Sequence, residues 1–322
     1  MRIHLPNSAR LQNLGGFIRR FDPADPSVLE FTMDHRWVAV HPAVLAFTAC
    51  VADHVSRAGG SHRGNVYPIR SLPYLIRMGL FEHVHIDYGR DIEAHEEAGR
   101  FIPIRHIQTT KELSDFIVNV IPLLHAEPTQ VEPIRYVISE LVRNVLEHAR
   151  APGGAFLCAQ FFKASGILSL GVADAGVGIR STMSRYHVAP TNWDALVLAM
   201  RPGISGTTGR IGGTDYNAGA GLFFTKSIAC ASRNYFAIYS GDAMFKLRTT
   251  PAREPILLYA DPQKDYHTRE SGLPIWPGTL VGVDISLDQQ QTFAALMRLI
   301  RDAYGLNVKG QRKARYKKAR FT

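Results

Sequence analysis

Two polar side chains in the middle of the chain are spaced so that they could act together. Glu140 and Asn144 are four residues apart in a stretch with helical periodicity, so both project from one face about one turn apart. A carboxylate placed there can orient or deprotonate a water molecule, and an amide oxygen can ligate Mg²⁺. The pair predicts a general base at Glu140 and a metal ligand at Asn144. Taken alone the pattern is weak, because most such pairs are solvated positions on a helix.

A second chemical segment, Asp174-Ala-Gly176-Val-Gly178, directly follows an apolar strand-like stretch. An acid at the end of a strand can accept a hydrogen bond from the exocyclic amine of adenine. The two glycines allow the backbone to approach a base without a Cβ in the way. The alternative interpretation is a tight turn capped by aspartate.

The third segment runs from Asn217 to Leu222, contains Gly219 and Gly221, and precedes a predicted helix. Glycine-rich backbone that leads into a helix presents free N–H groups and a favourable dipole to phosphate oxygens. A flexible loop with an ordinary helix cap is the alternative. The order of the three segments predicts a nucleotide site more strongly than any one of them does.

The elements that must position these residues are helices followed by strands. Helices are expected over residues 111–124, 133–148, 222–231 and 292–304, and strands over 155–162, 167–173, 235–239, 244–247 and 280–285. Helices laid over one face of a mixed sheet predict an α+β, two-layer sandwich.

The first hundred residues predict a smaller α/β unit. A strand is expected within 28–40, a helix over 43–55 after the break at His41-Pro42, and a second helix over 69–81, followed by a polar boundary region at 87–99. The expected organisation is therefore a small domain over 1–105, a larger domain over 106–305 and a basic tail over 306–322.

The charge is concentrated in that tail. The chain of 322 residues has a net charge of +9, and residues 1–308 carry 30 basic and 28 acidic groups. We expect a solvated, disordered end, and contact with nucleic acid is the less favoured interpretation. Three scattered cysteines, no signal-peptide pattern and no apolar run of membrane-spanning length predict a cytoplasmic protein without a membrane partner.

The sequences of these segments resemble the motifs of a known superfamily. The stretch Ser139-Glu-Leu-Val-Arg-Asn-Val-Leu-Glu-His-Ala149 resembles the N box of the GHKL (histidine kinase-like) ATPases, and is most similar to the anti-sigma serine kinases. Residues 174–178 resemble the first glycine box of that superfamily. Residues 219–222 resemble the second, although Asn217 stands where many members have glycine. Gly278-Thr279 resembles the later Gly-Thr element.

The resemblance implies a Bergerat-type sandwich over residues 107–290 that binds ATP and Mg²⁺ beneath a lid at 180–216. It implies Glu140 as the catalytic residue, Asn144 as the metal ligand, and the nucleotide-binding residues Asn144, Asp174, Gly176, Gly178, Gly219, Gly221, Leu222 and Thr279. The N-terminal unit is more faintly similar to a STAS-like domain, through Trp37-Val-Ala-Val-His-Pro42 and the apolar segment that ends at Phe81.

Two functions are consistent with this resemblance. The first is a cytoplasmic ATP-binding regulatory protein, in which lid closure controls a protein partner and Glu140 supports slow hydrolysis; several members of the superfamily act as homodimers. The second is a protein kinase that phosphorylates serine or histidine. His95-Glu96 is followed by no nearby proline, which argues against the histidine kinase version.

Overall fold

The centre of the fold is a seven-stranded sheet, seen in a computed structural model that describes residues 1–89, 101–119, 128–210, 220–286 and 293–316. The strand order is β11-β10-β9-β12-β8-β7-β6, and all neighbouring strands are antiparallel. The strands span β6 Phe101–Ile107, β7 Ala155–Phe162, β8 Ile167–Asp174, β9 Phe236–Gly241, β10 Ala243–Leu247, β11 His267–Glu270 and β12 Trp276–Ser286.

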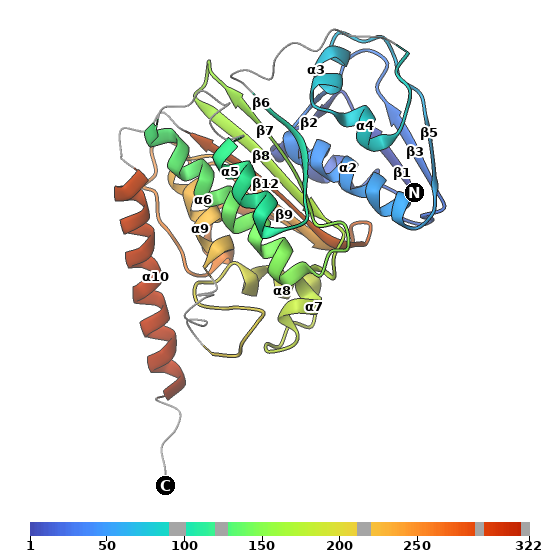
Figure 1. Ribbon diagram of the computed structural model, residues 1–322. Helices are drawn as coiled ribbons and strands as arrows, with labels where there is room; N and C mark the ends of the chain where they lie inside the picture. The colour runs from blue at the N-terminus through green and yellow to red at the C-terminus, as the bar shows by residue number, and fades with distance from the viewer. Residues whose placement is uncertain (90–100, 120–127, 211–219, 287–292, 317–322) are drawn as a thin grey trace.

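Long helices cover one face of this sheet (Figure 1). They are α5 Thr110–Asn119, α6 Pro128–Asn144 and α9 Gly221–Ala231, and α6 continues as a π-helix over Val145–Ala149. Helix α10 Phe293–Tyr316 packs against α6 and α9. Alternate residues of a strand face the same side, so Leu168, Leu170 and Val172 of β8 share one buried cluster with the apolar residues of α6 and α9. Two shorter helices, α7 Gly178–Met183 and α8 Asn192–Ala199, lie at one end of the sheet.

The N-terminal residues build a smaller unit. Strands β1 Arg2–Leu5, β3 Val28–Met33 and β5 Ser61–Gly64 form a parallel sheet, and β2 Ser8–Ala9 pairs with β4 Ala39–Val40. The helices of this unit are α1 Leu14–Ile18, α2 Pro42–Arg57, α3 Leu72–Arg77 and α4 Leu80–Val84, and short 3₁₀ turns lie at Leu11–Asn13 here and at Pro262–Lys264 near β11.

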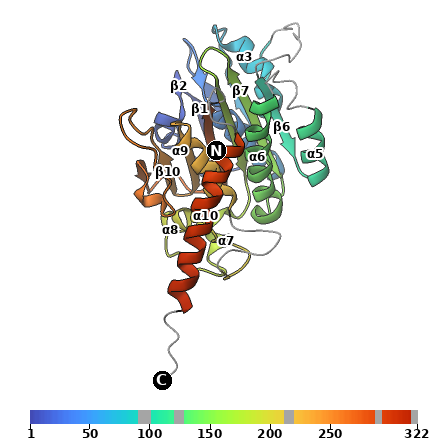
Figure 2. The same ribbon diagram turned by 90° about the vertical axis from the view of Figure 1, so that its left-hand side faces the viewer.

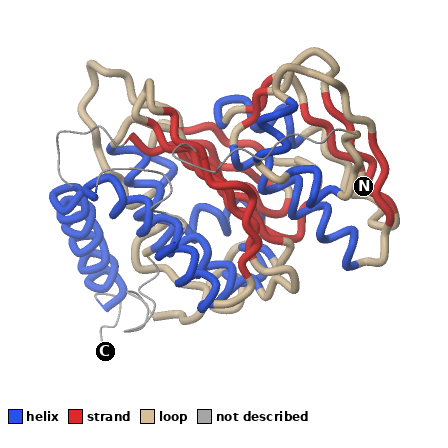
Figure 3. The backbone as a smooth tube through the Cα atoms, turned by 45° about the horizontal axis from the view of Figure 1, so that its top comes forward, coloured by secondary structure: helices blue, strands red, loops and turns tan. Residues whose placement is uncertain are grey.

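Helix α2 packs directly on the second face of the large sheet (Figure 3). The register places Cys158, Gly171, Gly282 and Ala237 side by side on four adjacent strands. A Cβ at Gly171 would lie 2.2 Å from the Cα of Ala43 in α2. This row of small residues therefore lets the helix approach the strands closely, and the sheet is covered on both faces.

Most of the expected elements are present, with corrections in the N-terminal half. The predicted α+β class is confirmed at the level of a mixed fold, and the helix over 43–55 lies within α2. The helix predicted over 69–81 is instead two helices, because Gly79 adopts a left-handed φ of +71° between α3 and α4. The predicted boundary at residue 105 falls inside β6, which belongs to the large sheet.

The C-terminal segment also differs from the prediction. Helix α10 continues to Tyr316, so residues 306–316 are helical, whereas residues 317–322 lie outside the described part. Val308 is buried at 7% exposure and the Gln311 Nε2 donates to the Pro202 carbonyl at 3.4 Å. These contacts with the body stabilise the helix beyond the predicted end at residue 304. Figure 2 shows α10 running along the molecule and past its lower end. Among the residues described, none of the helices has both the length and the apolar character needed to span a bilayer.

Candidate functional site

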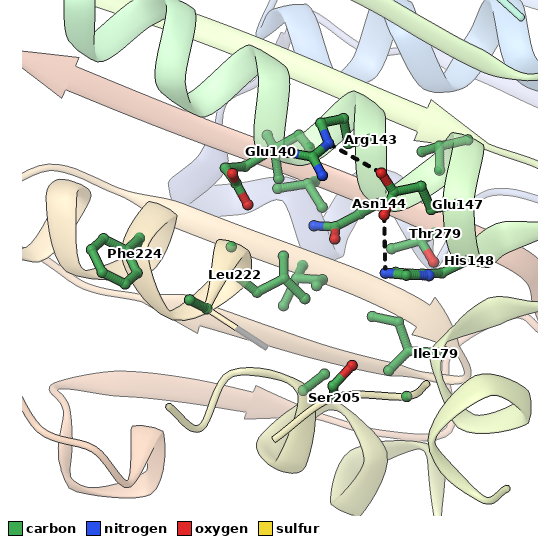
Figure 4. Close-up of a pocket in the computed structure, with 18 of the residues that line it drawn as sticks. Glu140, Arg143, Asn144, Glu147, His148, Ile179, Ser205, Leu222, Phe224 and Thr279 are labelled. Carbon is green, nitrogen blue, oxygen red and sulfur yellow. Dashed lines mark hydrogen bonds and ion pairs between the residues drawn. The ribbon is translucent and has the colours of Figure 1, made fainter. Parts of the chain in front are cut away.

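A pocket of about 470 Å³ lies between the helical layer and the large sheet (Figure 4). It brings together residues from four separate segments of the sequence. Those among the predicted site residues that line it are Glu140, Asn144, Asp174, Gly178, Gly221, Leu222 and Thr279. Gly176 lies beside the pocket and contacts Asp174, while Gly219 lies outside the described residues.

Asp174 is the last residue of β8 and is almost completely buried, at 2% exposure. Its Oδ1 accepts a hydrogen bond from the Gly176 amide at 2.7 Å. Burial raises the pKa of the Asp174 carboxyl to about 7, and hydrogen bonds from the main chain at Gly176 and Thr279 partly oppose that rise. Near pH 7 the ionised and neutral forms of this carboxyl are therefore both populated. The ionised form can accept a hydrogen bond from an amine of a ligand.

The glycines after Asp174 are needed because backbone segments meet here. Gly178 has a φ of +72°, and a Cβ at this position would lie 2.4 Å from the Pro277 carbonyl oxygen. A Cβ at Gly176 would lie 2.1 Å from the carbonyl oxygen of Ala149, the last residue of the π-helix. These clashes explain why the D-x-G-x-G spacing fits a strand end that is packed against two other chain segments.

Ser240 and Trp276 hold this end of the pocket together, and sequence reasoning gave neither of them such a role. The Ser240 hydroxyl donates to the Gly278 carbonyl at 2.8 Å and accepts from the Ile179 amide at 3.1 Å. The Trp276 indole donates to the carbonyl of Asp174 at 2.9 Å. The strand register aligns Asp174 of β8, Thr279 of β12 and Ser240 of β9. This pairing could not be read from the sequence, so Ser240 was not predicted to lie at the pocket.

Glu140 and Asn144 lie at the other end of the pocket, beside the start of α9. A Cβ at Gly221, the first residue of α9, would lie 2.5 Å from the Glu140 Oε2 and 3.3 Å from the Asn144 Nδ2. The Asn144 Nδ2 is buried without a hydrogen-bond partner among the described residues. An unsatisfied buried amide is costly, so a ligand or water contact is expected here.

Charge and burial tune the Glu140 carboxyl. Burial raises its pKa, Arg143 opposes that rise, and Glu147 adds to it. Arg143 and Glu147 form an ion pair at 3.1 Å, and the Glu147 carboxylate is 4.0 Å from His148 (Figure 4). Glu147 and His148 belong to the π-helix, a conformation often found at functional sites.

The start of α9 faces the pocket with main-chain atoms. Ala220, the residue before the helix, makes no side-chain capping hydrogen bond. Ala220, Gly221 and Leu222 all line the pocket. The first turn of a helix has N–H groups without partners inside the helix and carries a partial positive charge, so it is suited to an anion.

Lys226, further along α9, is a basic residue that could be expected to bind phosphate, but it forms a buried ion pair instead. Its side chain is 1% exposed and forms an ion pair with Asp265. It is absent from the described lining of the pocket. The positive end of α9, and not this lysine, is therefore the feature of the helix that a ligand can contact.

Comparison with known proteins adds no assignment. No protein-family model matches the chain. A search of curated proteins also finds no match. What the pocket does must be inferred from its geometry.

Proposed function

We propose that the chain binds an adenine nucleotide with Mg²⁺ in this pocket and that its sheet and helical layer form a Bergerat-type sandwich of the GHKL superfamily. The observation that carries the proposal is the buried Asp174, which lies among glycines at one end of the pocket. Asn144 and the start of α9 lie at the other end. One end offers an acceptor for an amine on a flat base, and the other offers groups for phosphates and a metal.

The residues fit the two parts of such a ligand. Asp174 would accept from the adenine amine, with Thr279 beside it on the neighbouring strand. Gly221 and Leu222 would present main-chain N–H groups to phosphate oxygens. The Asn144 side chain, whose nitrogen is buried without a partner among described residues, would supply its oxygen to the cation. Bound Mg²⁺ would neutralise part of the phosphate charge.

Glu140 gives the site a group for slow hydrolysis. Burial raises its pKa, so the carboxylate accepts a proton more readily than an exposed glutamate would. Water held by this carboxylate would lie beside the start of α9, where we place the phosphates. We infer a cytoplasmic regulatory protein whose nucleotide state controls contact with a protein partner.

Calorimetry with Mg²⁺ and ATP tests the proposal directly. Wild type should bind ATP, Asp174→Asn should bind it much more weakly, and Asn144→Ala should lose most of the Mg²⁺ dependence. The control Asp115→Asn changes an exposed residue of α5 and should bind like wild type. Absence of ATP binding by wild type would refute the proposal.

A phosphate-release assay on the same samples separates binding from hydrolysis. Glu140→Gln should abolish release and keep ATP binding, because the amide cannot act as a base. Release that persists in this variant would show that Glu140 is not the base. Incubation with labelled ATP, followed by a search for labelled protein, would reveal phosphoryl transfer instead.

A further inference from the structure

Part of the pocket wall comes from the C-terminal helix α10. Met297, Arg301 and Tyr304 of this helix line the pocket. The helix is held in place by Ile300, which is completely buried, and by the Tyr304 ring, whose centroid is 5.9 Å from that of Phe224 in α9. The inner side of α10 is therefore packed against the body, and Arg301 lies at the edge of that contact.

The position of Tyr136 shows which end of the pocket α10 closes. Tyr136 lies one turn before Glu140 on α6, and its ring centroid is 5.8 Å from that of Phe224. Burial raises the pKa of the Tyr136 hydroxyl, the Glu140 charge adds to the rise, and the Arg301 charge opposes it. Tyr136 therefore lies near the charges of both Glu140 and Arg301. Arg301 lies at the end of the pocket that contains Glu140, opposite the end that contains Asp174.

The balance of charge around the pocket leaves Arg301 available. The acidic residues in the described lining are Glu140, Glu147 and Asp174, and the arginines are Arg143 and Arg301. Arg143 is paired with Glu147 at 3.1 Å. Arg301 is exposed and forms no ion pair or hydrogen bond with any residue that the structure describes. In the described lining, the Arg301 guanidinium is therefore not paired with a carboxylate and is available to the phosphates of a ligand.

We propose that Arg301 binds the terminal phosphates of the nucleotide and makes the pocket selective for di- and triphosphates over monophosphates. The inference rests on the proposed function, because it assumes a nucleotide with its base at Asp174. A guanidinium matches the geometry of phosphate oxygens and can form two parallel hydrogen bonds with them. The contribution of α10 is then a specificity determinant outside the three segments that the sequence singled out.

Calorimetry with ATP, ADP and AMP in the presence of Mg²⁺ tests this role on the chain of 322 residues. Arg301→Gln should weaken ATP binding about 10-fold to 100-fold, since hydrogen bonds to charged groups are worth that much. Binding of AMP should stay the same. The matched control is Arg298→Gln, which removes the same charge from an exposed position of the same helix that does not line the pocket.

The possible results separate the two proposals. Equal ATP affinity in Arg301→Gln and Arg298→Gln, with wild-type binding intact, would overturn the role of Arg301 and leave the proposed function standing. If Arg301→Gln weakened the binding of ATP and of AMP equally, the role of Arg301 would be overturned as well. AMP lacks the terminal phosphates, so the loss of a contact with them cannot weaken AMP binding. Wild type that binds none of the three nucleotides would overturn both. Arg301→Lys, which keeps a point charge, should recover part of the ATP affinity.

Discussion

Replacing Asp174 by asparagine should make the protein more stable at pH 8 while it greatly weakens nucleotide binding. The side chain is 2% exposed, and burial raises the pKa of the carboxyl to about 7. Its ordinary value is 3.8. In the folded protein the proton is therefore held more tightly than in the unfolded chain, so this group favours folding at low pH. That contribution is full below about pH 4 and is lost as the pH rises through about 7.

The magnitude follows from the two pKa values. At 1.36 kcal/mol per pH unit, the ionised carboxylate destabilises the folded state by about 4 kcal/mol at pH 8. Asparagine has no such titration, and its oxygen can still accept from the Gly176 amide. Its buried NH₂ group lacks the ligand partner and costs about 1–3 kcal/mol at every pH. The net gain at pH 8 is then about 1–3 kcal/mol, and near pH 4 the variant should be the less stable protein.

Urea unfolding followed by circular dichroism from pH 4 to pH 8 measures this effect. The difference in unfolding free energy between Asp174→Asn and wild type should increase by about 4 kcal/mol across that range. For the exposed control Asp115→Asn the difference should stay nearly constant. A difference for Asp174→Asn that does not change with pH would refute the reasoning, because it would mean that the carboxyl has an ordinary pKa.

Three further predictions concern the pocket and the helix that borders it. Gly178→Ala should lower the unfolding free energy by about 2 kcal/mol, measured by urea unfolding, because φ is +72° and the new Cβ would lie 2.4 Å from a carbonyl oxygen. Gly221→Ala should weaken ATP binding about tenfold in calorimetry, because its Cβ would lie 2.5 Å from the Glu140 Oε2 and 3.3 Å from the Asn144 Nδ2 and would push the proposed metal ligand Asn144 out of position. Lys226→Met should cost about 3–5 kcal/mol of stability, because it leaves the buried Asp265 carboxylate without its ion pair; adding Asp265→Leu should recover much of the loss.

Matched substitutions separate these effects from a general response to mutation. Gly16→Ala in α1 and Gly305→Ala in α10 each add a methyl group with no atom within 4 Å. The first should leave stability within about 1 kcal/mol of wild type, and the second should leave ATP binding unchanged. Lys226→Met that unfolds at the wild-type urea concentration would contradict the assigned ion pair.

Local patterns were enough to predict most of the helices and strands around the pocket. The exceptions are α7 and α8, which line part of the pocket and lie mostly within 180–216, a stretch that was predicted only as a lid. The i, i+4 spacing of Glu140 and Asn144 and the position of Asp174 at the end of a strand depend only on nearby residues, and both are found as expected. The start of α6 was placed too late, at Pro133. A proline is favourable in the first turn of a helix, but the structure has Pro133 inside a helix that begins at Pro128.

Long-range pairing could not be predicted in the same way. Ser240 reaches the pocket only because β9 pairs with β12, and Trp276 reaches Asp174 across 102 positions of sequence. Arg301 was expected on a helix, but no periodicity indicates which surface that helix packs against. Strands β6 and β11 were missed, and their partners in the sheet are likewise distant in the chain.

The row of small residues beneath α2 affects how the chain can be divided for experiments. Gly171 and Gly282 have no side chains to shield the strands there, so removing α2 would expose backbone and apolar surface to water. The helix itself has twelve buried residues out of sixteen, and could not remain folded in water without the sheet. A fragment beginning at residue 106 would therefore be expected to aggregate, and the intact chain should melt in a single cooperative transition. Ligands that bind the pocket should then raise the melting temperature of the N-terminal unit as well.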